Sequence, residues 1–224
     1  MARIHPGSVT GIAATDPSSI EQLLDYRRQI AELYAEIRAA ADPRAAHARW
    51  CEARWRLYAT HPQSPVPAGE RGDYEGPHAW EYDPRWRLLA GVEAAPEQHF
   101  ELPSSDGATM RFVRFARARA GEIALDLFWL DAYGGGLFVP FADATSASES
   151  YGAGRYVLDT VKGADLGLQD GRLVLDLNFA YQPSCSYDAR WTCPLAPPAN
   201  RLRVAVRAGE RLQSAGRGTP AAPR

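Results

Sequence analysis

The spacing of the apolar residues changes once along this chain, and that change restricts the folds it can adopt. Between residues 18 and 62 apolar residues recur every three or four positions, which is typical of amphipathic helices. Asp42 and Pro43 divide this region into two helices, because aspartate caps helices well and proline fits a first helical turn. From about residue 85 the spacing approaches two, as in strands with one buried face. The sequence therefore predicts a helical hairpin followed by β structure.

The second region consists of short apolar stretches separated by turn sequences. Examples are "EIALDLFWLD" and "RLVLDLNF", with turns such as "SSDG", "YGGG" and "QDGR" between the stretches. We expect about eight to nine antiparallel strands that form a β-barrel or a sandwich. The predicted class is α+β. The expected organisation is a flexible arm at 1–17, the helical hairpin at 18–62, an antiparallel β domain at 63–212 and a disordered tail at 213–224.

Charge and composition argue against several classes of protein. The chain has 25 Lys and Arg residues against 27 Asp and Glu residues, so it lacks the basic surplus that binding to nucleic acid requires. No apolar stretch reaches the about 18 residues that a membrane span needs. The N-terminus also lacks the continuous apolar core of a signal peptide. We therefore expect a cytoplasmic protein with neither nucleic acid nor membrane as a partner.

Arg155 follows a glycine-rich turn in "SYGAGRY" and is expected to begin a strand. Its planar guanidinium group suits a carboxylate or phosphate of a ligand. It also suits an internal ion pair with Asp143, Asp159 or Asp176, and an arginine buried in a barrel needs a partner in either case. Asp143 likewise has two interpretations, a turn residue or a carboxylate that faces Arg155 across a pocket.

Asp176 and Asn178 lie two residues apart in "RLVLDLNF", on the face opposite the leucines of a predicted strand. Such a pair either lines an interior that holds a ligand or forms a hydrogen-bond network that fixes the following loop. If Asp176 lies close to Asp143, one of the two carboxyl groups acquires a raised pKa and suits acid–base catalysis.

Two of the three cysteines, Cys185 and Cys193, lie in one short segment rich in proline and aromatic residues. Their spacing is not that of a zinc ribbon. Three uses stay open: packing or a disulfide that closes a short loop, a metal site, and a reactive thiol. The prolines of "CPLAPPANRL" exclude a central strand and favour a stiff strap that returns over the Asp176 and Asn178 face.

The two segments "LFVPFADATSASESYGAGRYVLD" and "LVLDLNFAYQPSCSYDARWTCPLAPPANRLRVAVRAGE" resemble a prokaryotic family of domains of unknown function, DUF1684. Shared motifs include Pro-Phe-x-Asp, Gly-x-Gly-Arg-Tyr and Cys-Pro-x-x-Pro-Pro-x-Asn-Arg-Leu, and the resemblance covers roughly residues 50 to 210. The chain departs from the usual pattern at Ser150, Leu177 and Gln182, where the family has Thr, Phe and Asn. The resemblance implies a family but no reaction or cofactor.

The expected function is binding of a small polar or anionic molecule in a pocket at the mouth of the barrel, with acid–base catalysis as an extension. The candidate ligand-binding residues are Asp143, Tyr151, Arg155, Tyr156, Asp176, Asn178, Tyr181 and Cys185. One alternative is a non-enzymatic structural or protein-interaction module, in which these residues form an internal network and the hairpin docks a partner. Another is a metal site at Cys185 and Cys193. The sequence indicates no cofactor, no catalytic residue and no oligomeric state.

Overall fold

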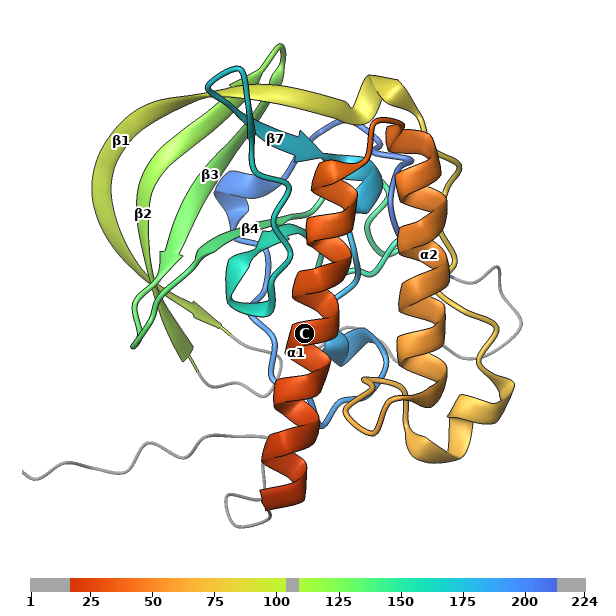
Figure 1. Ribbon diagram of the computed structural model, residues 1–224. Helices are drawn as coiled ribbons and strands as arrows, with labels where there is room; N and C mark the ends of the chain where they lie inside the picture. The colour runs from red at the N-terminus through yellow and green to blue at the C-terminus, as the bar shows by residue number, and fades with distance from the viewer. Residues whose placement is uncertain (1–16, 104–108, 213–224) are drawn as a thin grey trace, which may run out of the picture.

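The computed structural model describes residues 17–103 and 109–212. The chain begins with two neighbouring helices, α1 (Pro17–Ala39) and α2 (Pro43–Thr60) (Figure 1). The Asp42 side chain caps α2 by accepting a hydrogen bond from the backbone N–H of Arg44 at 2.9 Å, and Pro43 occupies the first turn, as predicted. The expected arm and tail lie outside the described residues, except for Pro17. Neither helix is long and apolar enough to cross a membrane, within the part of the chain described.

A seven-stranded antiparallel sheet follows, and it curls into a half-barrel (Figure 1). Its strands are β1 (Arg87–Pro103), β2 (Thr109–Ala120), β3 (Ile123–Leu130), β4 (Leu137–Phe141), β5 (Arg155–Asp159), β6 (Leu168–Gln169) and β7 (Arg172–Asp176). They are arranged in the order β5-β4-β3-β2-β1-β7-β6. The predicted α+β class, with a helical hairpin before an antiparallel sheet, is confirmed.

The strands are fewer than expected for two reasons. The stretches "RWRLLAGV" and "HFEL" each have the sequence of a separate strand, but from Arg87 onward both belong to the single long strand β1, which pairs with β2 on both sides of an irregularity between Ala94 and Gln98. The segment 202–208, "LRVAVRA", forms no ladder. Backbone carbonyls of Val206 and Ala208 in this segment accept hydrogen bonds from the Arg155 side chain.

Short 3-10 turns lie before, between and after the strands: η1 (Ala68–Asp73) and η2 (Pro84–Trp86) precede β1, η3 (Thr160–Lys162) lies between β5 and β6, and η4 (Leu177–Phe179), η5 (Ser184–Ser186) and η6 (Pro198–Asn200) follow β7. One isolated β-bridge joins β5, at one edge of the sheet, to the segment that follows β7. Tyr156 of β5 and Tyr181, which follows η4, exchange two backbone hydrogen bonds of 2.9 Å each. The sheet is therefore partly closed around its concave face.

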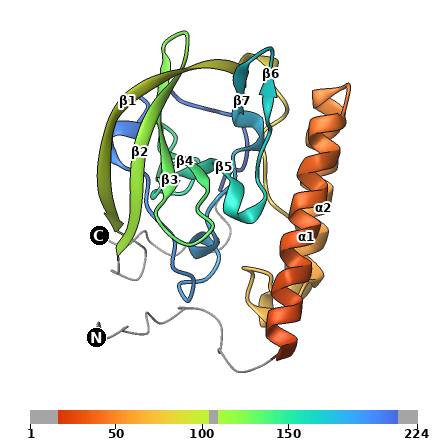
Figure 2. The ribbon, with the colours of Figure 1, turned by 60° about the vertical axis from the view of Figure 1, so that its left-hand side comes forward.

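The helices pack beside the β6 and β7 end of the sheet, away from β1 and β2 (Figure 2). One hydrophobic core joins the two layers, and it includes Trp50 and Tyr34 from the helices together with Leu175 and Phe179 from the β region. Because apolar side chains of the helices and the sheet share this core, the hairpin forms one wall of any cavity at the open side of the half-barrel.

Candidate functional site

Arg155 is held by internal contacts and is only 1% exposed. Its Nη2 donates hydrogen bonds to the Asp143 carboxylate at 2.6 Å and to the Val206 carbonyl at 2.9 Å. Its Nη1 donates to the carbonyls of Ala208 and Glu210. Burial lowers the pKa of Arg155, and the Asp143 carboxylate opposes that shift. These contacts are those of an internal ion pair with Asp143, and not those of a guanidinium group that faces a ligand.

Asp143 is both a turn residue and the ion-pair partner of Arg155. Its Oδ1 accepts hydrogen bonds from the backbone N–H of Thr145, at 2.6 Å, and from the Thr145 hydroxyl. Its Oδ2 faces Arg155. The Thr145 hydroxyl in turn lies 2.8 Å from that of Ser150. The carboxylate therefore joins the 143–150 turn to the start of β5.

Asp176 and Asn178 do not lie on one strand, because β7 ends at Asp176 and the chain turns into η4. The Asp176 carboxylate accepts hydrogen bonds from the backbone and the side-chain amide of Asn178, at 3.1 and 2.8 Å. The Asn178 amide also bonds both the N–H and the carbonyl of Asp83, at 2.9 Å each. The prediction that the strand continues through Phe179 was wrong, because the Asp176 side chain caps η4 and the backbone bends there.

The carboxylate of Asp176 is fully buried, and burial raises its pKa, although hydrogen bonds from Asn178 and Arg87 oppose that shift. Arg87 donates to its Oδ2 at 3.1 Å, and the Tyr82 hydroxyl lies 3.4 Å from the same atom. Asp143 is not among these partners. The described side chains thus show no carboxyl pair of the kind expected for acid–base chemistry.

The sulfur atoms lie in a small buried cluster with Tyr151. The Tyr151 hydroxyl is 3.8 Å from the Sγ of Cys185, and the Cys185 backbone N–H donates to the Sγ of Cys193 at 3.4 Å. All three cysteines of the chain are described, and none forms a disulfide. Hydrogen bonding to Cys185 and burial raise the pKa of Cys193. Buried thiols with raised pKa values are poor nucleophiles, so the packing interpretation fits best.

The metal alternative has no support in the structure. Within residues 17–103 and 109–212, no three His, Cys, Asp or Glu side chains come together as a possible ligand set. The proline strap contacts the glycine-rich turn, through a 3.3 Å hydrogen bond from the Ala196 N–H to the Ala153 carbonyl. Tyr151, from the glycine-rich segment, and Cys193, from the strap, also pack together with Cys185 in the sulfur cluster.

A cavity of about 240 Å³, here called the tyrosine cavity, lies between the helical hairpin and the strap. It is lined by Leu23, Tyr26, Arg27, Ile30, Tyr34, Arg54, Tyr58, Gln63, Lys162, Ala164, Tyr181, Ser184, Trp191, Thr192 and Cys193. Of the eight candidate residues, only Tyr181 is in this set. The wall carries three cationic side chains and four tyrosines, and none of its residues is acidic.

Arg54 forms the deepest cation of this wall and is 3% exposed. Its Nε donates to the Glu210 carboxylate at 2.7 Å, and its Nη2 donates to the Tyr58 hydroxyl at 2.7 Å. The guanidinium carbon lies over the rings of Trp50, Tyr58 and Tyr181, at 5.0, 4.7 and 4.8 Å from their centroids. Burial lowers the pKa of Arg54, but the adjacent Glu210 and the surrounding tyrosines together outweigh burial, so the pKa is raised.

Lys162, the only lysine of the chain, lies at the rim with its side chain 44% exposed. Its Nζ is 3.4 Å from the Asp159 carboxylate, which also accepts a hydrogen bond from the Tyr181 hydroxyl at 3.2 Å. Burial lowers the pKa of Lys162, but Asp159 together with Cys193 and Tyr26 outweighs burial, so the pKa is raised. Lys162 is therefore a cation at neutral pH.

The tyrosines of the cavity keep their protons. Burial raises the pKa of Tyr34 to about 12, and it also raises the pKa values of Tyr26, Tyr58 and Tyr181. Their hydroxyl groups are thus hydrogen-bond donors at neutral pH, while their rings supply apolar surface.

A second space, here called the apolar groove, has a volume of about 140 Å³ on the concave side of the half-barrel. It is lined by Met110, Phe112, Leu130, Phe138, Tyr156, Asp159, Val161, Lys162, Thr192 and Pro194. Among the candidate residues, Tyr156 belongs here. Its hydroxyl donates to the Pro194 carbonyl.

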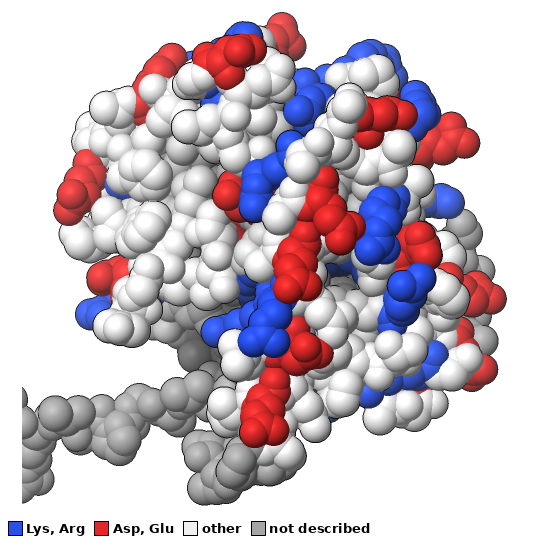
Figure 3. Space-filling model, viewed as in Figure 1, with Lys and Arg blue, Asp and Glu red and all other residues white. Residues whose placement is uncertain are grey.

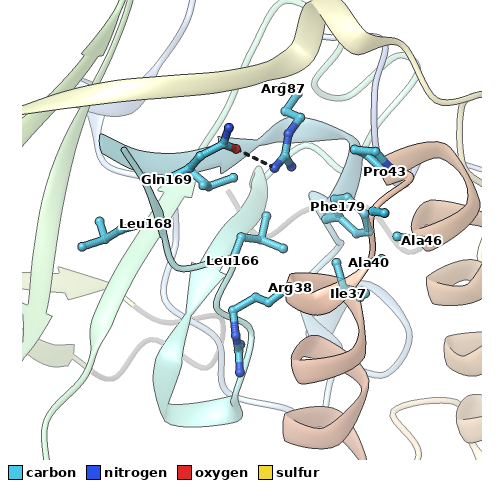
Figure 4. A pocket seen from close by; sticks show the side chains of 12 residues that line it. Ile37, Arg38, Ala40, Pro43, Ala46, Arg87, Leu166, Leu168, Gln169 and Phe179 are labelled. Carbon is cyan, nitrogen blue, oxygen red and sulfur yellow. Dashed lines mark hydrogen bonds between the residues drawn. The ribbon is translucent and has the colours of Figure 1, made fainter. Parts of the chain in front are cut away.

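A third cavity, of about 440 Å³, lies between the α1–α2 connection and β6–β7 (Figure 4). Its two cations are already engaged: Arg87 donates to Gln169 at 3.2 Å and to Asp176, and Arg38 donates to the Asp165 carbonyl at 2.6 Å. Most of the remaining wall is aliphatic. This cavity is larger than the tyrosine cavity, but it offers fewer polar groups to orient a ligand.

The sequence interpretation missed the contribution of the hairpin to the site. Arg54 stands four residues after Trp50 and four before Tyr58, so it lies on the apolar stripe of α2. A cation on a buried stripe requires a partner inside the protein. The position of Arg54 on the apolar stripe was visible in the sequence. Its partner could not be identified there, because Glu210 is 156 residues away in the chain.

Comparison with known proteins identifies the family. The family model described as "Protein of unknown function (DUF1684)" matches residues 72–211. An uncharacterised protein of Haloarcula marismortui with a solution NMR structure is 36% identical, with 70% of this chain and 87% of that chain covered and a TM-score of 0.49. The search of curated proteins gives no match. Because the family model covers more than half of the chain, this protein belongs to the DUF1684 family.

Proposed function

We propose that this protein binds a small anionic molecule in the tyrosine cavity. The observation that carries the proposal is the charge of the wall: Arg27, Arg54 and Lys162 line one cavity that is partly open to solvent, and none of the described lining residues is acidic. A cavity with converging cations concentrates anions and disfavours cations.

The charges around the cavity do not cancel. Glu210 balances Arg54, and Asp159 balances Lys162. Arg27 is exposed and forms no ion pair with any described residue. One positive charge is therefore left over, and a bound monoanion neutralises it.

The tyrosine rings suit a ligand with an apolar body. Tyr26, Tyr34, Tyr58 and Tyr181 all line the same space, and the hydroxyl groups of Tyr58 and Tyr181 are already bonded to Arg54 and Asp159. Small-molecule sites typically combine a mostly apolar wall with a few polar groups that set orientation. Of the residues expected from the sequence, the proposal retains Tyr181 here and Tyr156 in the adjoining apolar groove.

The proposal assigns binding and no reaction. Asp143 and Asp176, the carboxylates expected to act as acid and base, do not line the tyrosine cavity. Each is held by an arginine elsewhere. A cytoplasmic location, expected from the sequence, is part of the same proposal.

The proposal is tested by calorimetric titration and thermal unfolding with benzoate and its neutral analogue benzamide. We expect benzoate to bind and to raise the unfolding midpoint, because a ligand that binds only the folded state stabilises it, and benzamide to bind much more weakly. Inorganic phosphate is the probe for an anion without an apolar body. The proposal fails if neither anion binds, or if benzamide binds as tightly as benzoate.

Two neighbouring arginines provide a matched control. Arg27→Met removes a cation of the cavity, whereas Arg28→Met removes an equally exposed charge that does not line it. We expect the first variant to weaken benzoate binding about fivefold, as for one solvent-screened ion pair, and the second to leave it unchanged. Equal effects of the two variants contradict the proposed location.

A non-enzymatic structural or interaction module is the second candidate. It is favoured by the internal contacts of Arg155, Asp143, Asp176 and Asn178, which use these polar groups within the protein. The outer face of the hairpin carries charges of both signs (Figure 3). This candidate gains support if the anions do not bind while Arg155→Ala and Asp176→Asn each lower the unfolding midpoint by several degrees.

A further inference from the structure

The tyrosine cavity and the apolar groove adjoin each other. Lys162 and Thr192 line both spaces. Lys162 lies over the Tyr156 ring, 5.9 Å from its centroid, and Tyr156 is a wall of the groove. A ligand with its charged end at Lys162 therefore has an apolar surface within reach on the half-barrel side.

The groove itself has the chemistry of a site for a hydrocarbon chain. Phe112 of β2 and Phe138 of β4 stack with their ring centroids 5.2 Å apart, and Met110 and Leu130 complete this part of the wall. The one acidic residue of the wall, Asp159, is bound to Lys162 and Tyr181 at the cavity end. Away from this end the described lining carries no charge.

The volume of the groove limits the length of that chain. If each methylene takes about 30 Å³, as a water molecule does in the liquid, about 140 Å³ holds about four to five methylene groups. The carbons next to the carboxylate occupy the junction at Lys162 and Thr192. A chain of roughly six to eight carbons therefore fits, whereas a longer acid extends beyond the groove.

We propose that the ligand is a medium-chain aliphatic carboxylate, with its carboxylate in the tyrosine cavity near Lys162, where Arg27 supplies the unbalanced positive charge, and its chain in the apolar groove. This inference rests on the anion binding proposed above and adds the class of ligand. The cation at the junction recognises the head, and the concave wall of the half-barrel buries the tail.

The experiment is a calorimetric titration of the full chain with butyrate, hexanoate, octanoate and decanoate, below the concentrations at which they form micelles. Burial of one methylene contributes about 0.8 kcal/mol, so we expect affinity to rise up to about fourfold per added carbon. The rise should stop near eight carbons, so that decanoate binds no more tightly than octanoate. Octanol, which has the same chain without the charge, should bind at least tenfold more weakly than octanoate.

Variants of the groove and of Lys162 test the contributions of the hydrocarbon chain and of the carboxylate separately. Leu130→Gln changes the groove, and Val92→Gln places the same side chain at an exposed apolar position of β1 that does not line it. We expect the first variant to remove most of the gain with chain length and to leave butyrate binding unchanged, and the second to change neither. Lys162→Met should weaken all carboxylates about tenfold without weakening octanol.

The outcomes distinguish this inference from the function on which it rests. If benzoate and butyrate bind but affinity does not rise with chain length in the wild-type protein, the inference is overturned and anion binding stands. If none of the carboxylates and no benzoate binds, the proposed function is overturned and the inference falls with it. Octanol that binds as tightly as octanoate overturns the role of Lys162.

Discussion

Replacing Glu210 by glutamine is expected to destabilise the fold strongly, because Glu210 is a buried charge that joins three segments. Its Oε1 accepts hydrogen bonds from Arg54 of α2 at 2.7 Å, and its Oε2 accepts one from the backbone N–H of Gln182 at 2.7 Å. The Tyr187 hydroxyl lies 3.5 Å from Oε2. Glu210 itself is fully buried, so no water replaces a lost partner.

Glutamine has nearly the same shape but removes the negative charge and one acceptor. Its NH₂ group must face either Arg54 or the N–H of Gln182, and both are donors. Arg54 then remains as a buried cation without a counter-ion. Breaking one side of a buried ion pair typically costs about 3–5 kcal/mol. For a chain of this length that loss lowers the unfolding midpoint by roughly 6–20 °C.

The free energy of unfolding is measured by urea titration, with tryptophan fluorescence as the signal. Glu149→Gln is the matched control, since Glu149 pairs with Arg207 at 2.8 Å on the surface, where ion pairs contribute little. In the double variant Arg54→Met, Glu210→Gln no cation is left unpaired, so part of the lost stability should return. Equal midpoints for Glu210→Gln and Glu149→Gln would refute the assignment of Glu210 as a buried structural anchor.

Three further predictions concern protonation, backbone crowding and the thiols. Burial lowers the pKa of His47 to about 4 from 6.5, so below pH 6.5 the unfolded chain takes up a proton that the folded chain does not bind. The free energy of unfolding should therefore fall by up to about 3 kcal/mol between pH 6.5 and 4. Urea titrations at several pH values measure this fall, and a His47→Gln variant with the same pH slope as the wild-type protein would contradict the prediction. Gly154→Ala should destabilise the fold by at least about 1 kcal/mol more than Gly121→Ala. Both glycines have a positive φ, but a Cβ added at Gly154 would lie 2.5 Å from the backbone oxygen of Phe141, whereas one added at Gly121 would meet no atom within 4 Å. All three cysteines should be alkylated in denaturant without a reductant, and mass spectrometry that finds only one modified thiol would show a disulfide.

The fold class was predictable because it depends on local signals. The change in apolar spacing, the Asp42 cap and the turn sequences each act within a few residues, and all three agree with the structure. The end of β7 was not predictable from alternation. The leucines continue their two-residue spacing through Leu177, but the Asp176 side chain bonds the Asn178 backbone and turns the chain there. A short polar side chain can override a hydrophobic pattern where it caps a turn.

The candidate site was predicted less completely, because its residues are far apart in the chain. The local motifs drew attention to Arg155 and Cys185, which are chemically distinctive residue types in unusual sequence contexts. Both make internal contacts. The tyrosine cavity takes Tyr26, Tyr34 and Arg54 from the hairpin, and no local pattern relates these residues to a strap about 150 positions later. Only the packing of α1 and α2 against the half-barrel brings the two together.

The internal polar network and the proposed binding site are therefore not competing explanations of the same residues. Arg155, paired with Asp143, holds the segment from Val206 to Glu210 by donating hydrogen bonds to its backbone carbonyls. That segment in turn positions the Glu210 carboxylate against Arg54. Because Glu210 holds Arg54 in place, the guanidinium stays between the Tyr58 and Tyr181 rings at the cavity wall. Loosening the network at Arg155 should thus weaken ligand binding as well as stability, although Arg155 does not line the tyrosine cavity.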